Sequence, residues 1–66
     1  MEQTIGRRIA ENRKRLGMTQ DQLAEKLGLT AQAVSKWEND QSCPDITLLP
    51  RLAALLGMTV DQLLGA

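Results

Sequence analysis

Four side chains that can contact nucleic-acid bases lie close together in the segment between Thr30 and Asn39. If this segment is helical, its inner face holds Ala33, Val34 and Trp37. The positions that then point outward near its start are Ala31, Gln32, Ser35 and Lys36. Glutamine can pair with N6 and N7 of adenine, lysine can donate to O6 and N7 of guanine, and alanine can touch the methyl group of thymine. These residue types therefore predict a surface suited to the base edges of duplex DNA.

A second predicted helix, Thr19–Leu27, comes directly before this segment. Thr19 and Gln22 have the spacing of a capping box that begins the helix, and Gly28 suits the left-handed residue that ends it. Only Gly28 and Leu29 separate this helix from the cap of the next one, so the chain must turn sharply. Residues 19–39 therefore predict a helix-turn-helix unit, whose second helix presents its N-terminal half to the major groove.

The other segments also have helical periodicity, and none has the alternation of a strand, so the predicted fold is all-α, with one domain over residues 1–66. The three further predicted helices are Thr4–Leu16, Ile46–Leu56 and Thr59–Leu64. The first should bury Ile5, Ile9 and Leu16, and the fourth should bury Leu49, Leu52, Ala53 and Leu56. Thr47 is interpreted as the N-cap of the fourth helix, with Pro50 as its third residue.

The composition excludes several classes of enzyme and of binding site. The 66 residues include no His, one Cys, one Trp, and no Phe or Tyr. Without His there is no Ser-His or Cys-His nucleophile pair and no Cys/His zinc site, so we expect no catalytic residue, metal or cofactor. No apolar run approaches the ~20 residues of a membrane span, and one Trp cannot stack several single-stranded bases. The composition favours a small cytoplasmic domain that is not an enzyme.

The distribution of charge is uneven along the chain. Its 8 Lys and Arg balance its 8 Asp and Glu, so the formal net charge is zero. The first 16 residues carry an excess of positive charge and the remainder an excess of negative charge. A basic helix can face phosphate groups, yet zero net charge is low for a protein that binds nucleic acid. We interpret the Arg-rich first helix as a solvated face.

The helix-turn-helix unit and its surroundings resemble a known family. The residues that carry the resemblance are Arg13, Gly17-Met18-Thr19-Gln20, Leu23-Ala24, Leu27-Gly28, Val34-Ser35, Trp37-Glu38-Asn39, Pro44 and the run Leu52-Ala53…Leu56-Gly57. In these the chain is similar to the Cro/lambda-repressor-like helix-turn-helix domain, also called the XRE family. The resemblance extends from about Ile5 to Leu64.

The resemblance implies a fold, a function and a set of binding residues. The fold is a five-helix domain in which the second and third helices contact DNA. The function is transcriptional control, with repression favoured, by a homodimer on a roughly palindromic operator in double-stranded DNA. Carried over by position, Gln20, Thr30 and Asn39 would bind the phosphate backbone. Ala31, Gln32, Ser35 and Lys36 lie where the family contacts base edges.

The resemblance also pairs Arg13 with Glu38. Arg13 follows Ile9 by four residues on the apolar stripe of the first helix, where an unpaired charge would be costly. The family has an Arg and a Glu at these positions, so we expect a partly buried salt bridge between the first and third helices. One departure from the family is Asp40, which stands where a glycine is common.

Other interpretations of the same residues stay open. Gln32 and Lys36 could be solvated, and Gln20 could be an ordinary first residue of a helix. The whole chain could be a helical protein-interaction module, or the antitoxin component of a toxin–antitoxin pair. Leu63 and Leu64 cannot both face one small core, so the last helix is our candidate for a dimer interface. A longer regulator with a further C-terminal domain is a further expectation.

Overall fold

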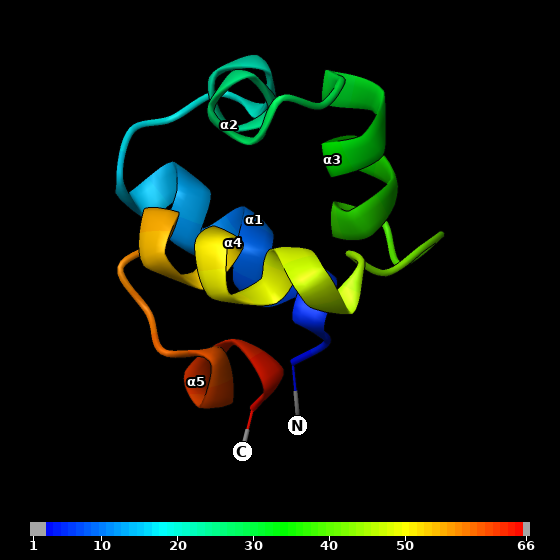
Figure 1. Ribbon diagram of the computed structural model, residues 1–66. Helices are drawn as coiled ribbons and strands as arrows, with labels where there is room; N and C mark the ends of the chain where they lie inside the picture. The colour runs from blue at the N-terminus through cyan, green and yellow to red at the C-terminus, as the bar shows by residue number, and fades with distance from the viewer. Residues whose placement is uncertain (1–2, 66) are drawn as a thin grey trace.

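A computed structural model describes residues 3–65 of the chain and confirms the all-α prediction (Figure 1). Within these residues there is no strand. The helices are α1 (Ile5–Arg15), α2 (Gln20–Leu27), α3 (Ala31–Glu38), α4 (Leu49–Leu55) and α5 (Val60–Leu64), with a short 3₁₀ helix, η1 (Ile46–Leu48), before α4. The helices α2 and α3 pack against each other at the top of Figure 1, α1 and α4 form the middle, and α5 closes the bottom.

One stripe of α1 faces the interior. The Thr4 hydroxyl accepts a hydrogen bond from the Arg7 amide and begins the helix. The buried residues of the stripe are Gly6, Ile9 and Arg13. The prediction that Leu16 lies on this face was wrong, because α1 ends at Arg15 and Leu16 turns away with 45% of its surface exposed.

The helix-turn-helix unit begins and ends where its caps predict. The hydroxyl of Thr19 accepts from the Gln22 amide, and the Gln22 side chain accepts from the Thr19 amide, which completes the capping box. Gly28, with φ of 72°, ends α2 in the left-handed conformation, and the Leu29 amide donates back to the carbonyl of Ala24. Only three residues, 28–30, therefore separate the end of α2 from the start of α3.

The turn after α3 holds a strained residue. Asp40 has φ of 60° and is the one non-glycine residue among 3–65 with a positive φ. A left-handed conformation costs an L-residue roughly 1–2 kcal/mol, although Asp tolerates it better than most. Within the described residues, the Asp40 carboxylate makes no hydrogen bond that would offset this cost.

Replacing Asp40 with glycine should stabilise the protein. We expect D40G to raise the free energy of unfolding by about 0.5–1 kcal/mol, because glycine has no Cβ to strain at this φ. Thermal and urea unfolding followed by circular dichroism would measure the change. The control is Gln41→Gly, which also increases the conformational entropy of the unfolded chain. Because it relieves no strain at a positive φ, it should lower the free energy of unfolding. A D40G variant that unfolds with or before the wild type would contradict the prediction.

The start of the fourth helix differs from the prediction. Thr47 is not the N-cap of α4, because that position is Leu48, which makes no side-chain cap hydrogen bond. Asp45 instead caps the preceding η1, where its Oδ1 accepts from both the amide and the hydroxyl of Thr47 at 3.0 Å. These hydrogen bonds, that from the amide foremost, hold the pKa of the Asp45 carboxyl below its ordinary value. Pro50 is the second residue of α4 and not the third, as predicted, and in this first turn its missing N–H needs no partner.

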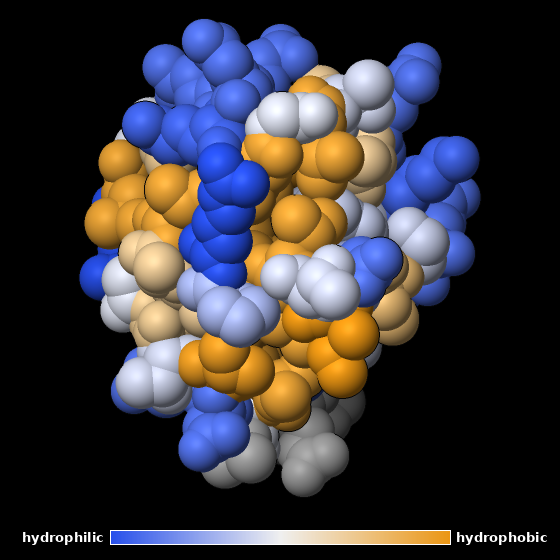
Figure 2. All heavy atoms as spheres, viewed as in Figure 1, coloured by the Kyte–Doolittle hydropathy of each residue, from blue (hydrophilic) through white to orange (hydrophobic). Residues whose placement is uncertain are grey.

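The core forms where all five helices meet. Its buried apolar residues are Ile9, Leu23, Ala24, Leu27, Val34, Trp37, Leu49, Leu52, Ala53, Leu56 and Leu63. Ala33 is only partly buried against this cluster. On the face shown in Figure 2, hydrophobic residues gather over α4, whereas α2 above it presents hydrophilic side chains. In α5, Leu63 is buried and Leu64 is 49% exposed, so the two leucines do point in different directions.

Candidate nucleic-acid interface

The outward positions of α3 form one surface. Residues four apart on a helix lie above one another, so Ala31 stacks with Ser35 and Gln32 with Lys36. Gln32 and Lys36 are exposed, and Ala31 and Ser35 are partly buried. We call these four residues the recognition surface. The helix lies at the edge of the molecule (Figure 1), and the inward side chains of Val34 and Trp37 hold it there.

The three candidates for phosphate contacts already have structural partners. The hydroxyl of Thr30 accepts from the Ala33 amide at 3.3 Å and caps α3. The Asn39 Nδ2 donates to the Ser35 Oγ at 3.3 Å. The Gln20 Nε2, at the start of α2, donates to the Glu38 Oε1 at 3.0 Å. These bonds orient the side chains and leave each with further hydrogen-bonding capacity.

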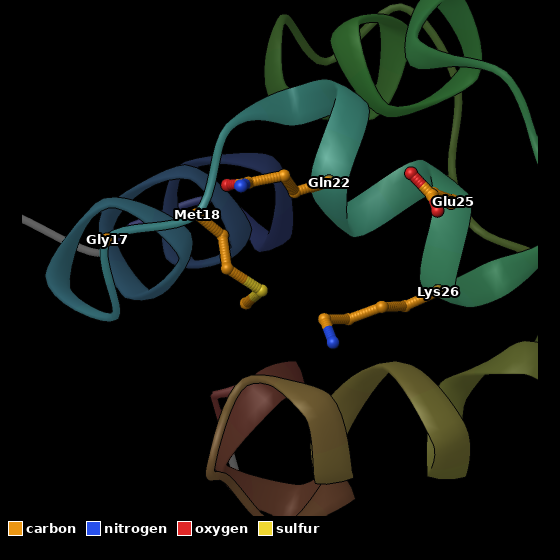
Figure 3. Close-up of a pocket in the computed structure, with 5 residues that line it drawn as sticks. All are labelled: Gly17, Met18, Gln22, Glu25 and Lys26. Atoms are coloured by element: carbon orange, nitrogen blue, oxygen red, sulfur yellow. The ribbon is translucent and has the colours of Figure 1, made fainter.

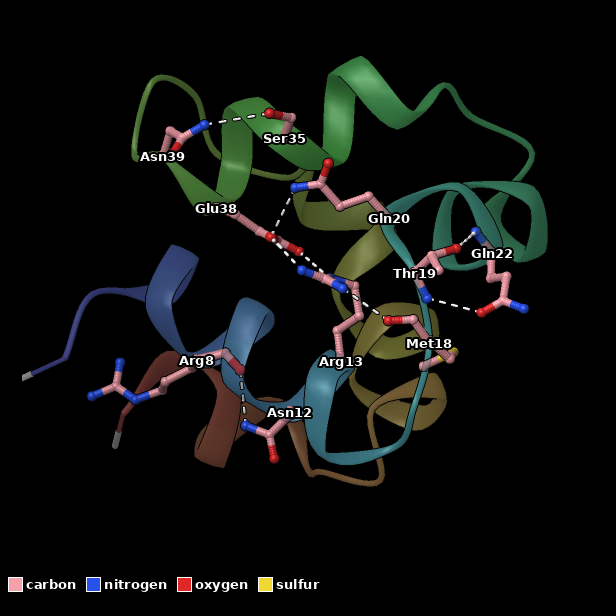
Figure 4. A network of polar contacts seen from close by, with 10 residues as sticks. All are labelled: Arg8, Asn12, Arg13, Met18, Thr19, Gln20, Gln22, Ser35, Glu38 and Asn39. Atoms are coloured by element: carbon pink, nitrogen blue, oxygen red, sulfur yellow. Dashed lines mark hydrogen bonds and ion pairs between the residues drawn. The ribbon is translucent and has the colours of Figure 1, made fainter.

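Arg13 and Glu38 form a two-pronged ion pair between α1 and α3 (Figure 4). The Arg13 Nε lies 2.7 Å from Glu38 Oε2, and Arg13 Nη2 lies 3.0 Å from Oε1. The guanidinium also donates to the Met18 carbonyl at 2.8 Å. The side chains are only 10% and 7% exposed. The pair thus joins α1, the turn before α2 and the end of α3. The hydrogen bond from Gln20 to Glu38 adds the start of α2 to this network.

The pKa of Glu38 shows which effect prevails in this network. Burial by itself raises the pKa of the carboxyl, because water no longer solvates its charge. The hydrogen bonds from Arg13 and Gln20, together with the charges of Arg13 and Lys14, act in the opposite direction and outweigh it. The pKa of Glu38 therefore lies below its ordinary value, and the group is a carboxylate at neutral pH.

The hydrogen bond between Gln20 and Glu38 was not predicted from the sequence. The two residues are 18 positions apart, and neither the periodicity nor the capping pattern relates them. It links the first residue of α2 to the last residue of α3, so both helices of the unit are bonded to the same buried carboxylate.

Residues 3–65 contain no group of three or more side chains that could hold a metal ion. None of the helices within that range has the length and hydropathy that crossing a bilayer requires.

Comparisons with known proteins agree with this geometry. A model of a family described as helix-turn-helix matches residues 9–63. The transcriptional regulator ImmR of Bacillus subtilis is 37% identical over 62 residues, which make up 94% of this chain and 49% of that protein, so this chain spans about half the length of that relative.

Solved structures of two DNA complexes are also similar. The P22 c2 repressor bound to a synthetic operator is 33% identical, with a TM-score of 0.89 over 96% of either chain. SinR, a regulator of biofilm formation crystallised with DNA, is 35% identical, with a TM-score of 0.83 over 92% of this chain and 98% of that one.

Proposed function

Because this chain belongs to the XRE-type helix-turn-helix family of transcriptional regulators, we propose that it binds a specific sequence of double-stranded DNA as a homodimer. Its operator is roughly palindromic, and occupation of that operator represses transcription. The observation that carries this proposal is the recognition surface of α3. Ala31, Gln32, Ser35 and Lys36 face outward together on a helix whose other side is fixed in the core.

The roles of the individual residues follow from their chemistry. Gln32 and Lys36 are exposed and long enough to reach base edges. Gln20, Thr30 and Asn39, at the start of α2 and at the two ends of α3, bind the phosphate backbone, which sets the register of the helix in the groove. With so few base contacts, one protomer binds weakly, and two protomers reach useful affinity by acting together. The exposed Leu64 of α5 supports a dimer contact at that helix.

A selection from random duplex DNA at low salt would test the proposal. We expect enrichment of paired half-sites about 10 bp apart, because a dimer places its two recognition helices one helical turn apart. Gln32→Ala and Lys36→Ala should each relax the base preference at one position of the half-site, at a cost of about 1–3 kcal/mol in discrimination. Lys26→Ala on α2 is the matched control and should leave the base preference unchanged.

Two other results would contradict parts of this proposal. A selection that enriches nothing, combined with retention of DNA that is insensitive to salt, would exclude DNA binding and favour the protein-interaction module. An enriched motif that Q32A and K36A leave unchanged would preserve DNA binding but move the base contacts away from α3.

A further inference from the structure

A groove lies between α1 and the helix-turn-helix unit, beside the polar network of Figure 4. It has a volume of about 450 Å³, and its lining includes Lys14 of α1, Gln20 of α2 and Asn39 at the end of α3. Gln20 and Asn39 are both candidates for phosphate contacts, predicted separately on two helices. The groove brings them onto one surface and adds a lysine that the sequence placed on a solvated face.

Among the described residues, Lys14 forms no ion pair in this groove, although its charge, after the hydrogen bonds and the charge of Arg13, also helps to lower the pKa of Glu38. Of the two carboxylates in the lining, Glu38 is paired with Arg13, and Glu11 lies 3.4 Å from the Nε of Arg7. Lys14 is exposed, and within residues 3–65 it forms neither an ion pair nor a side-chain hydrogen bond. The groove is therefore lined by an exposed ammonium group without an ion-pair partner and by the amides of Gln20 and Asn39, a combination of donors that suits an anionic oxygen.

The groove also adjoins the recognition surface. Asn39, on its edge, donates a hydrogen bond to Ser35 of that surface. The sugar-phosphate backbone borders the major groove of a duplex, so DNA seated on α3 brings its backbone to the edge that Asn39 marks. The anion that the position of the groove favours is therefore a phosphate of the bound DNA.

We propose that Lys14 binds a backbone phosphate in this groove together with Gln20 and Asn39. The inference rests on the proposed function and adds α1 to the DNA interface. Lys14 contributes affinity without base preference, because a phosphate contact carries no sequence information. It also explains how a chain of zero net charge can hold DNA, since the local charge at the contact matters more than the total.

The test measures how binding depends on salt. We expect K14Q to reduce the slope of log K against log salt by about 0.9, the value for one lost phosphate contact in B-DNA. Affinity should fall by the same factor for the selected operator and for a random duplex. Lys14→Arg should keep the wild-type slope, because it keeps the charge. Circular dichroism melts of these exposed variants should match the wild type.

The matched control is Lys26→Gln, which removes the same charge from another place. Lys26 lies on α2 and lines a different groove with Met18, Gln22 and Glu25 (Figure 3). We expect K26Q to bind with the wild-type slope. If K14Q has the wild-type slope, the inference about Lys14 is wrong, although the proposed function stands. The same conclusion holds if K14Q and K26Q lose an equal part of the slope. Wild-type binding that does not depend on salt would overturn the proposed function together with this inference.

Discussion

Glu38→Ala should lower the free energy of unfolding by about 3–5 kcal/mol, the usual cost of breaking a buried ion pair by removing one partner. The guanidinium of Arg13 would remain buried beside the cavity, with the Met18 carbonyl as its remaining acceptor. Gln20 would lose the acceptor of its Nε2 as well. In a domain of 66 residues, such a loss is a large part of the total stability.

Urea unfolding of three variants would test this expectation. Glu25→Ala, an exposed glutamate on α2, is the control and should change stability by no more than about 0.5 kcal/mol. The double variant Arg13→Met with Glu38→Leu replaces the pair by apolar groups and should recover most of the loss. An E38A variant that melts like the wild type would show that the pair contributes nothing to stability.

The parts of the fold that the sequence predicted correctly depend on neighbouring residues. Thr19, Gln22 and Gly28 act through the backbone within four positions of themselves, so their spacing alone marks where α2 begins and ends. The inward positions of α3 follow in the same way from helical periodicity. The bounds of the helix-turn-helix unit and the outward positions of α3 therefore follow from the local sequence.

The errors and omissions concern contacts that periodicity does not encode. Before the fourth helix, Asp45 and Thr47 both have side chains that can cap, and the residue types alone do not show that Asp45 caps η1 while α4 begins after Leu48 without a side-chain cap. Gln20 meets Glu38 because α1 and the turn before α2 bring the ends of α2 and α3 together. The groove at Lys14 depends on the same packing. The local pattern predicts which face of a helix is buried, but it does not predict which residues of the other helices contact that face.

Gly6 is the residue whose replacement should have the most unexpected effect. Gly6 is the second residue of α1, and within a helix Gly→Ala ordinarily stabilises by up to about 1 kcal/mol. Here Gly6 is buried where α1 crosses the end of α3, and a Cβ added to it would overlap the carbonyl oxygen of Trp37. It would also lie 2.7 Å from the Asp40 Oδ1. The carboxylate can rotate away, but the carbonyl belongs to the backbone and accepts a hydrogen bond from the Asp40 amide.

We therefore expect Gly6→Ala to destabilise the protein by about 3 kcal/mol or more, the upper range for overpacking a core. Urea unfolding would measure the loss. As a control, Ala54→Gly on the exposed side of α4 should destabilise by roughly 0.5–1 kcal/mol, the ordinary difference between glycine and alanine in a helix. Combining G6A with D40G should regain no more than the about 0.5–1 kcal/mol that D40G gives alone, because the main obstruction is the Trp37 carbonyl. A G6A variant as stable as the wild type would mean that α1 and α3 can move apart. Since Trp37 and the recognition surface share α3, it would also mean that the position of that surface is less tightly held than the contacts of Gly6 and Arg13 imply.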